Sequence, residues 1–100
     1  MKLIGYDKYY QKVIGDMGIL KATYCFQTDM DEVDLSTPFA TLDLPTISTD
    51  QSVIGYVGNN TEVPMTYVHL TKRIKTNSEM IVPKGTTIWF TLELGVDLDG

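Results

Sequence analysis

The densest group of potential metal ligands is an acidic segment that carries four carboxylates within seven residues: Asp29, Asp31, Glu32 and Asp34. Carboxylate oxygens are the ligands that Ca²⁺ prefers. An EF-hand loop starting at Asp29 would need a polar fifth residue, Gly at the sixth position and Glu at the twelfth. The sequence has Val33, Asp34 and Ala40 at these positions. We therefore expect no metal site and no cofactor, and we interpret residues 29–38 as an acidic loop.

Cys25 and His69, the only cysteine and the only histidine, are the second candidate for chemistry. A thiol beside an imidazole can act as a nucleophile when a third polar group orients the base. Both residues fall on the more polar side of their expected strands, so adjacent strands could bring them together. No nucleophile motif surrounds Cys25, and no glycine pattern matches a phosphate-binding loop. We expect a protein that is not an enzyme and has no catalytic residue.

The charges are segregated along the chain, whose net charge is −5 at pH 7. Residues 22–71 carry seven acidic side chains and no Lys or Arg, and a basic cluster follows at Lys72, Arg73 and Lys75. This acidic balance opposes binding to nucleic-acid phosphates and to anionic membranes. Opposite charges at separate places in one chain favour contacts between protein subunits. We therefore take the acidic segment and the basic cluster as candidate protein interfaces.

Alternation of apolar and polar residues, which is typical of half-buried strands, is the main structural signal. It is clearest at residues 20–27 and 87–94, and weaker at 40–44, 52–57 and 67–74. The expected inward-facing residues are Leu20, Ala22, Tyr24, Phe26, Ala40, Leu42, Leu44, Val68, Leu70, Ile74, Ile88, Phe90, Leu92 and Leu94. Gly58–Asn60 and Pro83–Gly85 are expected turns between strands.

The same alternation places three side chains outside the expected core: Tyr67, His69 and Trp89. Exposed aromatic side chains are common at protein interfaces, because Tyr and Trp offer much contact area for little loss of entropy. We expect these three residues to contribute to a binding surface.

The fold class follows from the number of short strands and the spacing of turns. Six to seven strands, with turn signals about every ten residues, predict an all-β protein built as a small antiparallel sandwich or barrel. Residues 1–14 fit neither period well; we favour a strand and leave a short N-terminal helix open. Residues 1–100 are expected to form one β domain. No signal peptide is seen, so we expect an intracellular protein or one assembled into a virion.

The function that these features favour is assembly through protein–protein contacts, either with further copies of the chain or in a larger particle. By analogy of composition, we expect a small phage or virion component of the tail, neck or connector type. The alternative is an acidic inhibitor that mimics nucleic-acid charge and binds a basic host protein. A third, less favoured hypothesis is a barrel that stacks single-stranded nucleic acid on Tyr and Trp. No small-molecule substrate is indicated.

Overall fold

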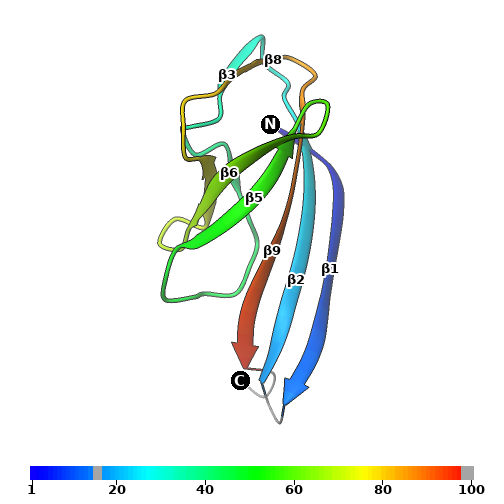
Figure 1. Ribbon diagram of the computed structural model, residues 1–100, viewed down its shortest axis with the longest axis vertical. Coiled ribbons are helices and arrows are strands. Elements are labelled where there is room, and N and C mark those ends of the chain that lie inside the picture. Colours follow the sequence, from blue (N-terminus) through cyan, green and yellow to red (C-terminus); the bar gives the residue numbers. More distant parts are fainter. Residues whose placement is uncertain (15–16, 98–100) are drawn as a thin grey trace.

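The computed structural model describes residues 1–14 and 17–97, and every regular element in this part of the chain is a strand (Figure 1). The expected domain of residues 1–100 thus includes two short stretches, 15–16 and 98–100, that lie outside the described part. The strands are β1 (Lys2–Ile14), β2 (Met17–Gln27), β3 (Glu32–Asp34), β4 (Ala40–Thr41), β5 (Gln51–Val57), β6 (Thr61–Val68), β7 (Arg73–Thr76), β8 (Ile81–Pro83) and β9 (Thr87–Asp97).

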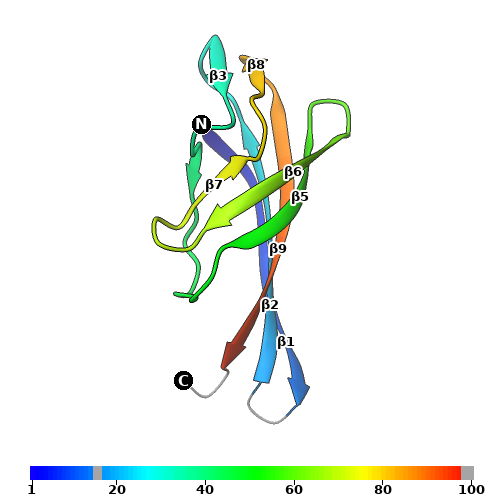
Figure 2. The ribbon, with the colours of Figure 1, turned by 60° about the vertical axis from the view of Figure 1, so that its left-hand side comes forward.

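Seven of these strands form one curled antiparallel sheet in the order β1-β2-β9-β5-β6-β7-β4. The sheet bends around its own inner face like half of a barrel, as the turned view in Figure 2 shows. β3 and β8 pair separately as a small second sheet. The predicted all-β fold is confirmed. Its architecture is a single curled sheet with a small second sheet of two strands. Residues 1–14, for which a short helix was the alternative, contain the strand β1.

The three longest strands, β1, β2 and β9, run side by side along the length of the molecule (Figure 1). The pairing of β2 with β9 is continuous, from Met17 opposite Asp97 to Gln27 opposite Thr87. β1 pairs with β2 with shifts in register between Leu3 and Gly5 and near the far end of the strand. These strands give the molecule its elongated shape, with extents of 47 × 23 × 20 Å.

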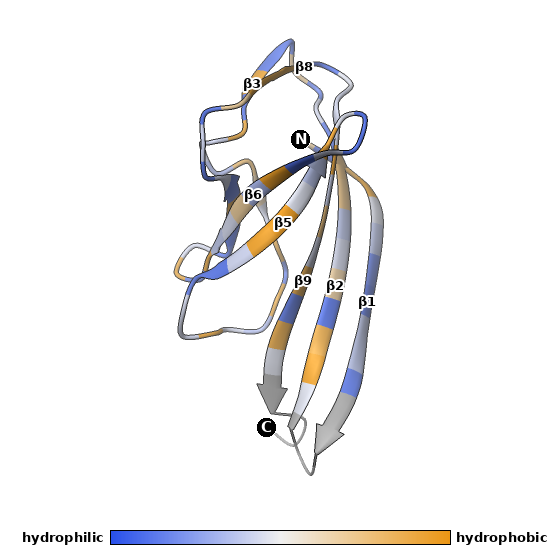
Figure 3. Cartoon of the chain, viewed as in Figure 1, coloured by the Kyte–Doolittle hydropathy of each residue, from blue (hydrophilic) through white to orange (hydrophobic). Residues whose placement is uncertain are grey.

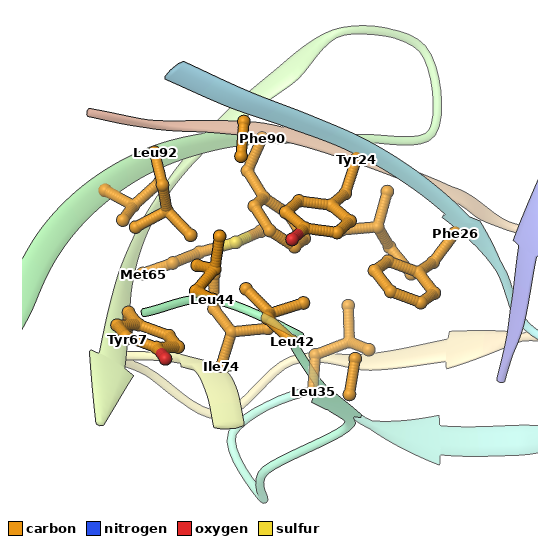
Figure 4. Packing of buried hydrophobic residues seen from close by; sticks show 14 of the residues in the cluster. Tyr24, Phe26, Leu35, Leu42, Leu44, Met65, Tyr67, Ile74, Phe90 and Leu92 are labelled. Carbon is orange, nitrogen blue, oxygen red and sulfur yellow. The ribbon is translucent and has the colours of Figure 1, made fainter. Parts of the chain in front are cut away.

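The hydrophobic core fills the inner face of the curled sheet (Figure 4). Figure 3 shows its origin in the sequence most clearly along β9, where hydrophobic and hydrophilic residues alternate. The expected inward rows of β2 and β9 are buried throughout, which confirms the period-two interpretation. Leu42 and Leu44 follow β4 and pack onto the same core, and three aromatic rings stack at its centre: Tyr24, Phe26 and Phe90.

The predicted faces of residues 67–70 are wrong, and Val68, expected inside, is only half-buried. Tyr67, expected outside, is fully buried, whereas Leu70, expected inside, is 83% exposed. The reason lies in the ends of the strands. β6 stops at Val68, and residues 69–72 form a turn in which Lys72 has a φ of 57°. The alternation therefore does not continue from β6 into β7, and Met65 and Tyr67 set the inward face of β6 instead.

Both expected turns are confirmed. Gly58 and Asn60 have φ values of 62° and 63°, and Gly85 has a φ of 86°, which glycine adopts without strain. The turn at Gly85 does not join two paired strands, since β8 pairs with β3 and β9 pairs with β2 and β5. The partner of β8 lies inside the expected acidic loop, three residues of which are therefore a short strand.

A candidate binding surface on the outer face of the sheet

An exposed apolar patch lies on the outer face where β5 and β9 pair. Tyr56 is directly opposite Trp89 in the register of these strands. The two rings are 43% and 48% exposed, and Ile54, two residues along β5, is 49% exposed. Because strand residues alternate between faces, Val53 and Val57 point into the core while these three side chains point away from it. We call Ile54, Tyr56 and Trp89 the outer aromatic patch.

A hollow of about 460 Å³ opens at this patch. None of its lining residues is charged, and they combine aromatic with hydroxyl and amide groups: Thr23, Ile54, Tyr56, Asn60, Trp89, Phe90 and Thr91. The hydroxyls of Thr23 and Thr91, on neighbouring strands, hydrogen-bond to each other at 2.9 Å. The patch thus combines exposed rings with polar groups at its margin, an arrangement typical of a surface that binds a partner.

The backbone beneath the patch is held closely by the core. A Cβ atom added to Gly55 would lie 2.6 Å from Met65 Sδ and 3.1 Å from the carbonyl oxygen of Trp89. Phe90, next to Trp89 but on the inner face, stacks on Tyr24 with ring centroids 5.5 Å apart. Since both strands are fixed from below, the exposed rings are presented on a rigid base, and little entropy is lost when they bind.

Of the three aromatic side chains predicted to face outward, only Trp89 belongs to this patch. Tyr67 lies in the core. His69 is beyond the end of β6, where its backbone N–H donates to Asp50 Oδ1 at 2.9 Å and its Nδ1 lies 2.6 Å from the same oxygen. These hydrogen bonds hold the pKa of Asp50 below its ordinary value. His69 therefore anchors the loop that precedes β5.

The four carboxylates of the acidic segment do not act as one group. Asp29 accepts a hydrogen bond from the α-amino group of Met1 at 2.6 Å, and Asp34 accepts two from Ser36. These contacts lower the pKa of both carboxyl groups. Only Asp31 and Glu32 are exposed without a hydrogen bond or ion pair among the described residues. The surface charge available to a partner is thus smaller than the sequence indicates.

The basic cluster is also divided between roles. Arg73 donates a hydrogen bond from Nη2 to the carbonyl of Pro38 at 2.8 Å, which ties the connection before β4 to β7. Lys75, opposite Thr66, and Lys72, in the turn before β7, are both half-buried. Within the described residues, no side chain of this cluster pairs with the acidic segment.

The proposed thiol–imidazole pair is not assembled. Cys25 lies on β2 and is 1% exposed, and burial raises the pKa of its thiol. β9 and β5 separate β2 from β6, after which His69 lies. Among residues 1–14 and 17–97, no three His, Cys, Asp or Glu side chains gather in a way that could hold a metal ion. No helix there is long and apolar enough to cross a membrane.

Two of the three patch residues, Ile54 and Tyr56, were missed because they were not assigned to a face of their strand. In the stretch Ser52–Val57, buried and exposed residues alternate, with Val53, Gly55 and Val57 at the buried positions. Extending the rule that identified Trp89 to this stretch would have found both side chains. Their position opposite Trp89 depends on the pairing of β5 with β9, which joins residues far apart in the sequence.

Fold and surface together define an all-β protein with a curled sheet and an aromatic patch on its outer face. Comparisons with protein-family models, with curated proteins and with solved structures find no match to this chain.

Proposed function

We propose that the chain is a non-enzymatic β module that associates with further copies of itself through the outer aromatic patch. The observation that carries the proposal is the cross-strand pair of Tyr56 and Trp89, both about half exposed on a rigid base. If each ring buries a further ~100 Å² on assembly, roughly 25 cal/mol per Å² gives about 2.5 kcal/mol per ring before the costs of association.

Charge supports a contact between copies of the chain. Asp31 and Glu32 are exposed and have no ion pair among the described residues. At the turn into β7, Arg73 is exposed and Lys72 is half-buried. Opposite charges on different parts of one subunit favour head-to-tail contacts, which close into rings or extend into filaments. A small part of a larger particle, such as a phage tail, neck or connector component, is the setting that we propose by analogy of composition.

Sedimentation velocity over a wide concentration range, at low and moderate salt, tests this function. We expect wild-type assemblies to dissociate on dilution, and Trp89→Ala to weaken association roughly 30-fold, as for a hot-spot residue worth about 2 kcal/mol. Leu70→Ala is the matched control, because it removes a more exposed apolar side chain away from the patch. A wild-type chain that stays monomeric at every concentration would refute the proposal.

The alternative function, an acidic inhibitor of a basic protein, is supported by the exposed carboxylates of Asp31 and Glu32. It is weakened by Asp29 and Asp34, which already have hydrogen-bond partners inside the fold. Under this alternative, Asp31→Asn with Glu32→Gln would abolish partner binding while Trp89→Ala would leave it intact. The two functions therefore predict opposite results from the same pair of variants.

A further inference from the structure

The curled sheet has two unpaired edges, β1 and β4. No Cα atom of β1 lies within 8 Å of a Cα atom of β4. Hydrogen-bonded strands lie about 4.8 Å apart, so these edges cannot pair with each other. Figure 2 shows the N-terminal part of β1 and the green segment near residue 40 on the same side of the molecule. We call the opening between them the seam.

The seam contains a cleft of about 350 Å³, separate from the hollow at the outer aromatic patch. Its sides come from both edges and its floor comes from β2. The lining residues are Leu3, Tyr6, Tyr24, Phe26, Thr41 and Asp43. The cleft is mainly apolar, and the lining residues that carry polar side-chain groups are Tyr6, Tyr24, Thr41 and Asp43.

The hydroxyl of Tyr24 has no hydrogen-bond partner among the described residues, although Tyr24 is only 3% exposed. Burial is the main cause that raises the pKa of this phenol, and the next contributions come from Tyr6 and Asp43, two other residues of the cleft. Tyr24 lines the cleft, and its hydroxyl oxygen has almost no exposed surface. A buried donor without an acceptor is unfavourable, and no polar group of the cleft is hydrogen-bonded to this hydroxyl.

The directions of the strands determine what could fill the seam. With seven antiparallel strands, the first and the last, β1 and β4, run in the same direction. One inserted strand can therefore be antiparallel to both edges. It needs two strand spacings, about 9.5 Å, and the absence of any Cα pair within 8 Å between β1 and β4 permits this width. The result would be eight strands, the number at which side chains fill a barrel interior.

We propose that the seam binds one extended segment of another polypeptide, which pairs antiparallel with β1 and β4 and places an apolar side chain and a hydrogen-bond acceptor over Tyr24. The segment must be unpaired before it binds, since both edges of the strand that it forms are needed for pairing with β1 and β4. The β1 edge of a second folded copy does not qualify, because its other side is already paired with β2. Strand addition to a sheet edge is a known mode of peptide recognition.

The edge of β1 is suited to this pairing along most of its length. From Gly5 to Lys12 its register with β2 is uninterrupted, so its free backbone groups repeat regularly. Tyr6 stands on the same face as Tyr24, its partner in β2, with ring centroids 5.2 Å apart. The shift between Leu3 and Gly5 limits the regular stretch on one side. This surface differs from the outer aromatic patch, so the inference does not depend on the proposed function.

A library of linear 12-residue peptides, displayed on phage and selected on the intact chain, tests the inference. The selected peptide is then synthesised and titrated into labelled protein by NMR. We expect enriched peptides with alternating apolar residues, and amide shifts in both β1 and β4. Failure to enrich any peptide, or shifts confined to the outer aromatic patch or to one edge, would overturn the proposal.

Two variants make the test specific. Leu3→Asp places a charge in the cleft and should weaken peptide binding at least tenfold. Ile54→Asp, at a side chain with the same 49% exposure on the outer aromatic patch, should change the dissociation constant less than twofold. Tyr24→Phe removes only the unpaired hydroxyl. It should leave the free chain at least as stable as wild type while weakening the peptide about threefold to tenfold, and unchanged binding to this variant or to Leu3→Asp would contradict the inference.

Discussion

Tyr67→Phe is expected to stabilise the protein, although it deletes an atom from the core. Tyr67 is fully buried beside Met65 and Ile74, and its hydroxyl has no hydrogen-bond partner among the described residues (Figure 4). Leaving such a buried polar group unpaired costs about 1–3 kcal/mol, whereas an apolar group of the same shape costs little. Allowing for partial relaxation around the hydroxyl, we expect the free energy of unfolding to rise by about 1 kcal/mol.

The assay is urea unfolding at pH 7, combined with calorimetry. For a domain of this size, about 1 kcal/mol corresponds to a rise in Tm of roughly 4–8 °C. The control is Tyr56→Phe, which removes the same hydroxyl from an exposed side chain and should change stability by no more than about 0.5 kcal/mol. A loss of stability of 1 kcal/mol or more in Tyr67→Phe would refute the reasoning, because it would mean that the hydroxyl is well bonded in solution.

Three further predictions concern single positions. Gly55→Ala should destabilise the protein by about 1–3 kcal/mol in urea unfolding, since the new methyl group would meet the buried Met65 side chain. Gly85→Ala should cost only about 1–2 kcal/mol in the same assay, because its φ of 86° is strained for alanine while the space around it is open. Asp50→Asn should lower stability at neutral pH. The pKa of Asp50 in the folded state lies below its ordinary 3.8, so the stability that wild type has over the variant is complete above pH 3.8 and is lost as the pH falls through the folded-state pKa. Urea unfolding of both proteins at pH 3 and at pH 7 measures this difference. A constant difference between the two pH values would contradict this assignment.

The sequence predicts the inward and outward faces well for strands that have one buried face. β2 and β9 alternate over their whole central stretch, so their inward rows and the outward position of Trp89 follow from period two alone. Prediction fails where a strand ends, because alternation cannot reveal the turn that exposes Leu70 and separates β6 from β7. It also fails for Tyr67. Alternation placed Tyr67 on the same face as His69, two residues further on, but β6 ends at Val68, before His69.

The candidate surface depends on pairings that the sequence does not encode locally. Tyr56 and Trp89 are brought together by the register between β5 and β9, strands that three others separate along the chain. The acidic segment shows the converse problem. Its charges are obvious in the sequence, yet the hydrogen bonds from Ser36 and the Met1 amino group that occupy Asp34 and Asp29 appear only in the folded chain.

The most direct test of the central claim uses Trp89, the single tryptophan, as its own reporter. Its emission maximum and its quenching by acrylamide are measured across a dilution series in which sedimentation gives the assembly state of the wild-type chain. If the outer aromatic patch forms the contact, the emission should shift to longer wavelength and quenching should increase as assemblies dissociate. Assemblies that dissociate with no change in either signal would contradict the account, because Trp89 would then lie outside the interface.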